Sequence, residues 1–412
     1  MSQGRAAVGA EPSLRPAGLA ASAARGAALA DAERRLAPEV AAGILEAGFA
    51  RHFVPASRGG AAGGWAELLG AVATVAEGCA STAWCASVLA GAARMGAFLP
   101  EEGQEELWAE GPDTTVVGAL VPRGAARPVA GGWRVSGAWD FTSGVGFSDW
   151  ALVCAPVPEG AAGPEGAAEG PREATGSERG RAPWFFALPR AAYRVAETWN
   201  PVGLRGTASH TLLVDDVFVP AHRGFARERM WLGRPVGSRA RCHTVPLPLV
   251  SGLLFGAPAL GAARAALRDG TRGMAAGAAG GAPRPEATLT VARAASAVDA
   301  AGLLMERAAR TADAPRAGPH EIARNQADCA FAVERLVDAV EAVYRRVGSS
   351  AQLADRPLQR AWRDIHTLAS HVALRFESVG AAYGTALLET GRGAEPSHHE
   401  PADGPYERSV LP

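Results

Sequence analysis

The stretch with the most chemical content is Gly137–Gly144, which reads Gly-Ala-Trp-Asp-Phe-Thr-Ser-Gly. Trp139, Phe141 and Ser143 alternate along it, so on a β-strand they would share one face. Aromatic rings beside a hydroxyl suit a planar heteroaromatic ligand, which needs apolar walls and one polar partner at its edge. An ordinary half-buried strand gives the same spacing, and the pattern alone favours that simpler interpretation.

A second stretch, Gly203-Leu-Arg-Gly-Thr207, places free backbone N–H groups and the cation of Arg205 in a turn. Such a turn suits a phosphate or another polar ligand edge. The signal is weak alone, because most turns of this kind only reverse the chain.

A late helical segment carries His366 and His371. A separation of five residues rotates the second side chain by about 500°, so the two imidazoles point about 140° apart. They cannot line one cavity equally, and the i,i+4 spacing that suits a shared metal is missing. A single helix histidine is more often a packing or surface residue, so the residues alone do not assign a role to either.

Composition limits the class of protein. The chain has 412 residues and a mass of 42.2 kDa, which favours more than one domain. Hydrophobic residues make up 48% and the net charge is −1, so a large core is possible and no basic field attracts nucleic acid or an anionic membrane. The 41 cationic side chains are all arginine.

Five scattered cysteines, with no Cys-x-x-Cys pair, predict neither a disulfide scaffold nor a metal site. We find no signal-peptide pattern and no uninterrupted apolar run of the ~18 residues that a membrane span needs. The expectation is a cytoplasmic protein with reduced thiols.

Changes in composition and hydrophobic periodicity divide the chain into a helical part, a β-rich part and a second helical part. Short segments rich in Val, Trp, Phe and Thr indicate strands at Thr114–Leu120, Gly132–Trp139, Trp150–Pro156, Trp184–Pro189 and His210–Val219. The expected division is a flexible tail at 1–17, a helical domain at 18–112, a β domain at 113–225 with a surface loop at 159–181, a helical bundle at 226–390 and a tail at 391–412. Ligand sites concentrate at such domain junctions.

Motifs in order along the chain resemble one family. They are Gly78-Cys-Ala-Ser-Thr-Ala-Trp84, Trp133–Gly144, Gly203–Thr207, Val214-Asp-Asp-Val-Phe-Val-Pro220 and Gln359–His371. The sequence is similar, over about residues 20 to 390, to oxygenase components of two-component flavin-dependent monooxygenases, which include p-hydroxyphenylacetate, steroid and polyketide phenol hydroxylases.

The resemblance implies an α+β, acyl-CoA dehydrogenase-like fold: an N-terminal helical domain, a central β-barrel domain and a C-terminal four-helix bundle. It also implies a homotetramer that takes reduced FMN, with FAD as the alternative, from a separate NAD(P)H:flavin reductase. No G-x-G-x-x-G follows a predicted strand, which agrees with the absence of an NAD(P)H site.

The implied reaction is hydroxylation of an aromatic substrate, phenolic or polyketide-derived, by O₂ through a flavin C4a-hydroperoxide. Because water destroys this intermediate, the cavity must be dry. Walls and substrate contacts would come from Trp84, Met95, Gly118 and Leu120. Ordinary core packing is an equal alternative for Trp84 and Met95, and it is the favoured interpretation for Leu120.

The resemblance also implies roles for individual residues. Ser143 matches a serine near flavin N5, beside Trp139 and Phe141, and His371 matches a histidine that takes the phenol proton, with His366 as the second candidate. The remaining cofactor-binding candidates are Gly144, Arg205, Thr207, Arg241, Gly348, Ser349 and Ser350.

The sequence departs from the family in two places. Val88–Met95 lacks the histidine that some members use to hold a substrate hydroxyl, and Gly118 stands where a serine is expected. The substrate should therefore not be p-hydroxyphenylacetate, and the small residues would leave room for a bulkier, polycyclic ring.

Three alternatives stay open. One is an N-hydroxylase of the nitrososynthase type. Another is an acyl-CoA dehydrogenase, which needs a carboxylate base, although neither Glu377 nor Glu389 matches its position. The last is a binding protein without flavin.

Overall fold

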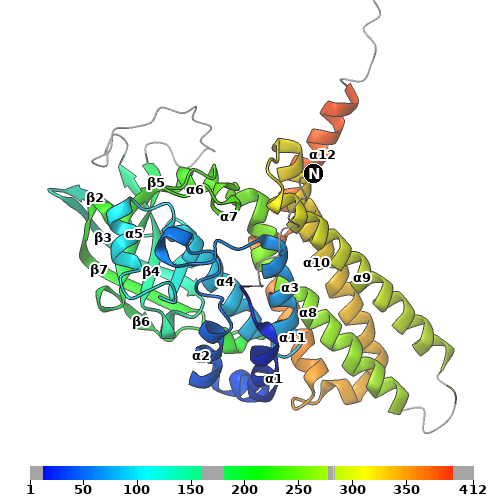
Figure 1. Cartoon of the computed structure of the whole chain (residues 1–412). Coiled ribbons are helices and arrows are strands. Elements are labelled where there is room, and N and C mark those ends of the chain that lie inside the picture. Colours follow the sequence, from blue (N-terminus) through cyan, green and yellow to red (C-terminus); the bar gives the residue numbers. More distant parts are fainter. Residues whose placement is uncertain (1–12, 159–180, 277–281, 283, 393–412) are drawn as a thin grey trace, which may run out of the picture.

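The structure is a computed structural model that describes residues 13–158, 181–276, 282 and 284–392. Most of the two expected tails and residues 159–180 of the expected surface loop lie outside the described residues. Helices, then strands, then helices follow one another along the chain, and Figure 1 shows the strands gathered at one side and the long helices at the other.

The N-terminal part is helical and apolar. Small residues dominate it, and α4 is buried along nearly its whole length. Proline at the first position starts α1 and α2, where its fixed φ suits the first turn. The helices are α1 (Pro16–Glu33), α2 (Pro38–Glu46), α3 (Trp65–Ala76), α4 (Ala80–Gly96) and α5 (Glu101–Leu107).

The middle part consists of two four-stranded sheets, with orders β1-β4-β5-β8 and β2-β3-β7-β6. The strands are β1 (Val116–Ala119), β2 (Ala125–Val129), β3 (Gly132–Thr142), β4 (Trp150–Pro158), β5 (Arg181–Pro189), β6 (Arg194–Ala196), β7 (His210–Pro220) and β8 (Gly224–Ala226). The five segments expected from composition all become strands. The short strands β2, β6 and β8 were not anticipated, because three to five residues carry little periodicity.

The end of β3 corrects one expectation. Trp139 and Phe141 do not share a regular strand face, because the β3–β7 register shifts between Trp139 and Thr142 and Phe141 has a φ of 61°. This bulge turns the strand after Trp139. Trp139 is therefore 1% exposed, while Phe141 is 71% exposed.

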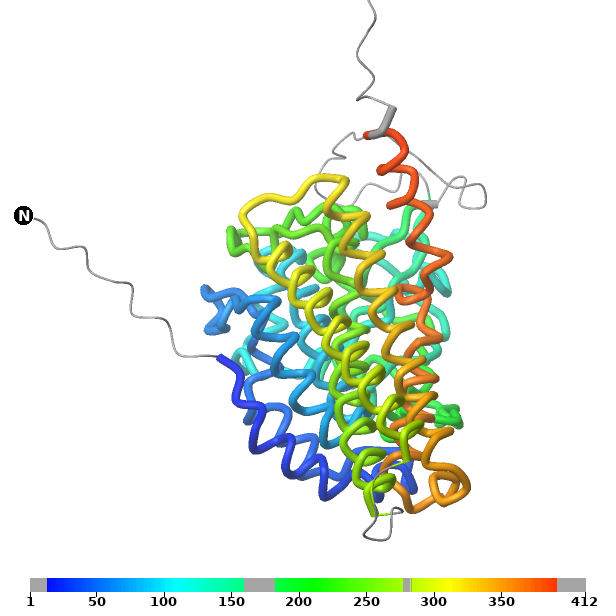
Figure 2. Tube along the Cα trace, turned by 90° about the vertical axis from the view of Figure 1, so that its right-hand side faces the viewer, coloured from blue at the N-terminus to red at the C-terminus, as the bar shows by residue number. Residues whose placement is uncertain are grey.

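The C-terminal part is again helical. Its helices are α6 (Arg227–Trp231), α7 (Arg241–Thr244), α8 (Leu247–Ala276), α9 (Pro285–Asp313), α10 (Pro319–Val347), α11 (Pro357–Ala369) and α12 (Phe376–Arg392). Figure 2 shows α8, α9 and α10 running side by side, in agreement with their packing. Helix α8 also packs on α3, α4 and α11, so it joins the two helical parts.

Two helices, α8 and α9, are long and apolar enough to cross a membrane by length and composition alone. This test averages hydropathy over a window that tolerates polar residues, so it does not contradict the expectation of no uninterrupted apolar run of that length. The apolar window of α8 is 89% buried, as in the core helix of a globular fold, whereas that of α9 is 28% buried. Leu289 and Leu303 of α9 are exposed in the single chain.

Candidate active site

A cavity of about 480 Å³ lies where the three parts of the chain meet. Its lining comes from α4, from the ends of β1 and β3, from the loop before β7, from α8 and from the C-terminal end of α11. Its size is within the roughly 300–1,000 Å³ of typical small-molecule sites. Of the residues expected at the site, it brings together Trp84, Met95, Gly118, Leu120, Trp139, Phe141, Ser143, Thr207 and His371.

One wall of the cavity is aromatic. The His371 ring stacks on Phe255 of α8, with 3.9 Å between centroids, and meets the edge of Trp84 at 5.9 Å. Trp84 and Phe255 are themselves 5.7 Å apart. These rings come from α4, from α8 and from His371, so the fold has to assemble this wall from distant segments. His371 lies two residues beyond the end of α11, in extended backbone, which corrects the expectation that it shares a helix with His366.

A row of hydroxyl groups adjoins the aromatic wall at Trp84. Trp84 donates its Nε1–H to Ser143 Oγ at 2.9 Å, and Ser143 Oγ lies 2.7 Å from Ser209 Oγ. Ser209 Oγ lies 2.7 Å from Thr207 Oγ1, which donates to the Leu204 carbonyl oxygen at 2.9 Å. Ser143, Thr207 and Ser209 all line the cavity.

The bulge in β3 decides how its aromatic residues meet the cavity. Trp139 is buried and donates Nε1–H to the Cys154 carbonyl oxygen at 2.7 Å. Phe141 lines the cavity although it is mostly exposed, and its ring meets the edge of Trp199 at 6.0 Å. A planar ligand or a second subunit would cover Phe141, since large exposed aromatic rings are costly in water.

His371 is neutral at physiological pH. Burial, and secondarily the nearby Arg375 cation, lower the pKa of His371 to about 4. Its Nδ1 accepts the Ala373 backbone N–H at 3.3 Å. A neutral imidazole has one protonated nitrogen, so this contact favours the tautomer with hydrogen on Nε2. His371 thus offers a hydrogen-bond donor before it offers a base.

The space expected beside Gly118 is partly filled. A Cβ at Gly118 would lie 3.1 Å from Met95 Sδ, and one at Gly91 would lie 3.0 Å from a Leu254 methyl group. Met95 and Leu254 therefore take up part of the space beside these two glycines, which both line the cavity. Room for a bulkier, polycyclic ring stays a prediction.

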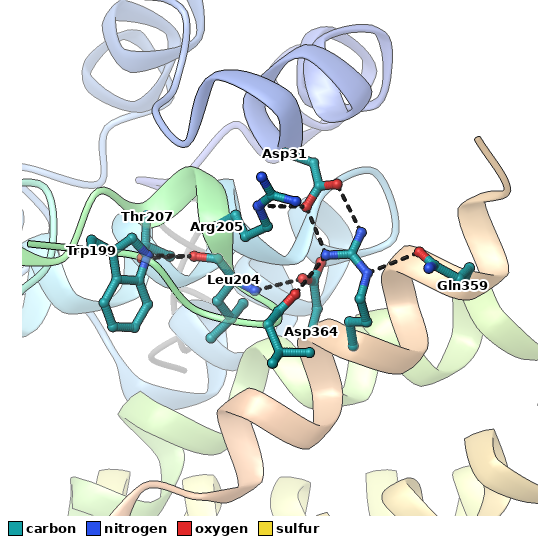
Figure 3. A network of polar contacts seen from close by, with 9 residues as sticks. Asp31, Trp199, Leu204, Arg205, Thr207, Gln359 and Asp364 are labelled. Carbon is teal, nitrogen blue, oxygen red and sulfur yellow. Dashed lines mark hydrogen bonds and ion pairs between the residues drawn. The ribbon is translucent and has the colours of Figure 1, made fainter. Parts of the chain in front are cut away.

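Several expected residues lie outside this cavity. His366 is exposed, sits 3.4 Å from Glu341 and packs its ring on Trp362, because it points to the other side of α11. Arg205 faces Asp31 at 4.0 Å (Figure 3), and Arg241 donates to the Ala312 carbonyl oxygen at 2.9 Å. The single chain therefore does not place these three side chains at the cavity.

The glycine and serine candidates for cofactor binding differ in where they lie relative to the cavity. Gly144 adopts a φ of 72° and donates its N–H to the Thr207 carbonyl oxygen at 3.1 Å, so it shapes the turn below Ser143. Ser349 and Ser350 follow Gly348 in an exposed turn between α10 and α11, away from the cavity residues of this chain.

Sequence reasoning missed Ser209, Phe255 and Asp364. Ser209 follows Thr207 by two residues within the Gly203–Ser209 stretch, and this hydroxyl spacing was an available signal. Phe255 carried no such signal, since an aromatic residue in an apolar helix is expected to pack in the core. Asp364 is buried beside the Leu204 backbone, a contact that sequence does not show.

The residues present fit a flavin. The cavity combines exposed aromatic surface at Phe141 with a row of hydroxyls, which are the walls and polar edge that an isoalloxazine ring needs. Ser143, Trp139, Phe141 and Trp199 would hold such a ring. Among the described residues, no group of three or more His, Cys, Asp or Glu side chains could hold a metal ion.

Known proteins agree with this arrangement. The family described as "Acyl-CoA dehydrogenase, C-terminal domain" matches residues 253–376. The FADH(2)-dependent resorcinol hydroxylase oxygenase component of Rhizobium sp. (strain MTP-10005) is 33% identical over 361 residues, which cover 81% of this chain and 83% of that protein. The flavin-dependent monooxygenase oxygenase subunit HsaA of Rhodococcus jostii (strain RHA1) is 31% identical over 370 residues, 85% of this chain and 91% of that protein.

A solved structure shows the same fold. The 3-HSA hydroxylase from Rhodococcus sp. RHA1 superposes with a TM-score of 0.82 at 26% identity, covering 90% of this chain and 95% of that one. The chain belongs to the oxygenase components of two-component flavin-dependent monooxygenases, with an acyl-CoA dehydrogenase-like fold. Its helical, β-sheet and helical order confirms the fold expected from the sequence, and as an oxygenase component it depends on reduced flavin from a separate reductase.

Proposed function

We propose that this oxygenase component hydroxylates an aromatic, phenolic substrate with O₂. The observation that carries the proposal is the apolar cavity in which the Ser143 hydroxyl and the neutral His371 ring face a common space. The similarity to the Rhizobium oxygenase component supports it, since that protein is a resorcinol hydroxylase. The polyketide-derived origin of the ring is the finer part of the proposal.

The proposed cofactor is reduced FMN, with reduced FAD as the alternative. The name of the Rhizobium relative specifies FADH(2), so that alternative has support of its own. When bound, reduced flavin supplies the electrons that activate O₂. The separate enzyme that reduces it would be an NAD(P)H:flavin reductase, and both proteins would act in the cytoplasm.

The chain's own residues would bind the ring edge, exclude water and hold a proton. Ser143 would contact the flavin edge, and Trp139, Phe141 and Trp199 would enclose the ring. Trp84, Phe255 and Leu254 keep water from the reacting atoms. The Nε2–H of His371 donates to the substrate oxygen and orients the phenol, and removal of the phenol proton by His371 requires the Ala373 contact to open.

We also propose a homotetramer. The apolar residues Leu289 and Leu303 of α9 are exposed in the single chain, and Phe141 lines a cavity yet stays uncovered. Contacts between subunits would cover such surface. The exposed Gly348–Ser350 turn, Arg205 and Arg241 would then be tested as contacts of cofactor phosphate, as the family resemblance implies.

One alternative, the acyl-CoA dehydrogenase, lacks its base here. Glu377 and Glu389 are exposed and do not line the cavity. Asp140 is the one carboxylate among the described lining residues, and it accepts a hydrogen bond from Thr211 at 2.8 Å and faces Arg123 at 3.8 Å. The other alternative, N-hydroxylation of an amino group, needs the same cofactor. Only the identity of the substrate distinguishes it from hydroxylation of a phenol.

The deciding experiment begins with anaerobic titration of the protein with reduced FMN and, separately, reduced FAD. The complex is then mixed with O₂ and a panel of phenols and aryl amines, and product and H₂O₂ are counted. A hydroxylated phenol in stoichiometric amount supports the proposal. Hydroxylation of amines alone, or no binding of either reduced flavin, would contradict it.

A further inference from the structure

The hydroxyls of Ser143, Ser209 and Thr207 form a continuous row between the Trp84 indole and the Leu204 carbonyl. Each neighbouring pair is within 2.9 Å. The hydrogen-bond role of the group at each end of the row is fixed. The indole N–H can only donate, and the carbonyl oxygen can only accept.

Counting protons fixes the direction of the whole row. Each hydroxyl has one proton, and three contacts remain after the Trp84 N–H is assigned. Thr207 must give its proton to the Leu204 carbonyl, so Ser209 must donate to Thr207 and Ser143 must donate to Ser209. Every contact is satisfied in this arrangement alone.

The consequence appears at Ser143. Its proton is engaged by Ser209 and one of its lone pairs by the Trp84 indole, so its remaining lone pair is what it offers to a ligand in the cavity. Ser143 is therefore a hydrogen-bond acceptor there. Reduced flavin carries hydrogen on N5 and donates at that edge, whereas oxidised flavin has a bare N5 and needs a donor.

The accepting end of the row is held by strained and buried groups. Leu204 and Ala208 have φ values of 51° and 44°, which side-chain-bearing residues rarely adopt. The Leu204 carbonyl also accepts the Trp199 indole N–H at 3.1 Å, and the Leu204 amide donates to the buried Asp364 carboxylate at 2.6 Å. Figure 3 shows the Leu204 backbone lying between Trp199 and Asp364.

The residue before Asp364 anchors the same end of α11. Arg363 donates to both carboxylate oxygens of Asp31, at 2.8 and 3.0 Å, and to the Val202 carbonyl at 2.7 Å. Helix α1, the loop before β7 and helix α11 are thereby tied together. Strain of this kind persists where the surroundings over-determine the backbone, which is common at functional sites.

We propose that Ser209 and Thr207 are positioning residues that set Ser143 as an acceptor, and that this row makes the site select reduced over oxidised flavin. The inference rests on the proposed function, in which Ser143 meets flavin N5. The inference goes beyond that function because it attributes the preference for reduced flavin to Ser209 and Thr207, which need not contact the reacting atoms. Removing the Ser209 hydroxyl leaves the Ser143 proton without its acceptor. Removing the Thr207 hydroxyl leaves the Ser209 proton without its acceptor, so Ser209 can donate to Ser143 and release the Ser143 proton toward the cavity.

The test is the ratio of dissociation constants for oxidised and reduced FMN, measured anaerobically by quenching of tryptophan fluorescence. Ser209→Ala should reduce this preference about five- to tenfold, since one hydrogen bond contributes about 1 kcal/mol. Thr207→Val should also reduce the preference for reduced FMN. Ser209→Thr, which keeps a hydroxyl at this position, should keep the wild-type ratio. Ser148→Ala is the matched control, because it removes a buried hydroxyl, 2.8 Å from the Tyr193 hydroxyl, outside the cavity.

The outcomes separate the two proposals. If wild type binds reduced FMN and hydroxylates a phenol while Ser209→Ala and Thr207→Val keep the wild-type ratio, the inference fails and the proposed function stands. An equal change in Ser148→Ala would also overturn it, since general loosening would then be the cause. Wild-type protein that binds no flavin would overturn both.

Discussion

Ser143 is the residue on which coupling of oxygen use to product should depend most. It is placed by the Trp84 indole on one side and Ser209 on the other. Ser143→Ala should still bind reduced FMN, because the aromatic walls remain, yet release several-fold more H₂O₂ per product. Peroxide and product counted in the same turnover check this, and unchanged coupling would remove Ser143 from the mechanism.

The pKa of His371 gives a second prediction at this scale. Because that pKa is lowered to about 4, the ring stays neutral well below pH 6.5, the usual midpoint for histidine. The hydroxylation rate should therefore show no acid-side loss from His371 between pH 8 and about pH 5. His371→Asn keeps a donor and should retain more activity than His371→Ala. Equal activity of all three proteins would exclude a role for this ring.

At the scale of elements, the contact between α11 and the loop before β7 depends on Asp364. Burial raises the pKa of Asp364 to about 6, and the Leu204 amide and Arg363 oppose that rise. Asp364→Ala leaves the Leu204 N–H without its acceptor and should lower the free energy of unfolding by about 1–3 kcal/mol. Asp364→Asn keeps an acceptor without a buried charge and should lose less. Urea unfolding compares them, and equal losses would show that packing, and not this hydrogen bond, holds the loop.

The packing of α4 against β1 gives a prediction about substrate size. A Cβ at position 118 would press on Met95 Sδ at 3.1 Å, and methionine yields by moving its flexible side chain. Gly118→Ala should therefore push Met95 into the cavity and raise KM more for polycyclic phenols than for single-ring phenols.

Adding Met95→Ala should reverse that preference, because it empties the space that Met95 occupied. Steady-state kinetics with a matched pair of phenols measure the effect. If Gly118→Ala changes KM equally for both phenols, Met95 does not set the size limit.

At the scale of the whole molecule, buried histidines make the fold sensitive to acid. Burial lowers the pKa values of His243 and His371 to about 4, and it also lowers that of His52. Their unfolded values are near 6.5, so the unfolded chain binds more protons between about pH 6.5 and 4 and stability falls through that window. Asp364 acts in the opposite sense, since its raised pKa favours the folded state there. It is one group against four, because burial also lowers the pKa of the half-buried His210.

The melting temperature should therefore drop as pH is lowered from 7 to 4.5. His243→Gln should flatten this dependence, because it removes a ring that must stay neutral between the Phe53 carbonyl and Ser238. A melting temperature that is constant or rises over this range would contradict the assignment of these histidines as neutral and buried.

The class of fold follows from the amino-acid sequence. Periodicity separated helical from β-rich parts because exposed and buried positions alternate differently in each, and the order of motifs carried the family resemblance. It also named Ser143, Trp84 and His371, since their residue types and their place in recognisable motifs survive without coordinates.

Tertiary structure alone decided how those residues meet. The β3 bulge separated Trp139 from Phe141, helix rotation turned His366 to the surface, and Met95 took up part of the space beside Gly118. The hydroxyl row and its anchor at Asp364 join residues up to 160 positions apart in sequence. Such contacts depend on how helices and strands pack against one another. Local sequence patterns do not predict contacts between residues that lie so far apart along the chain.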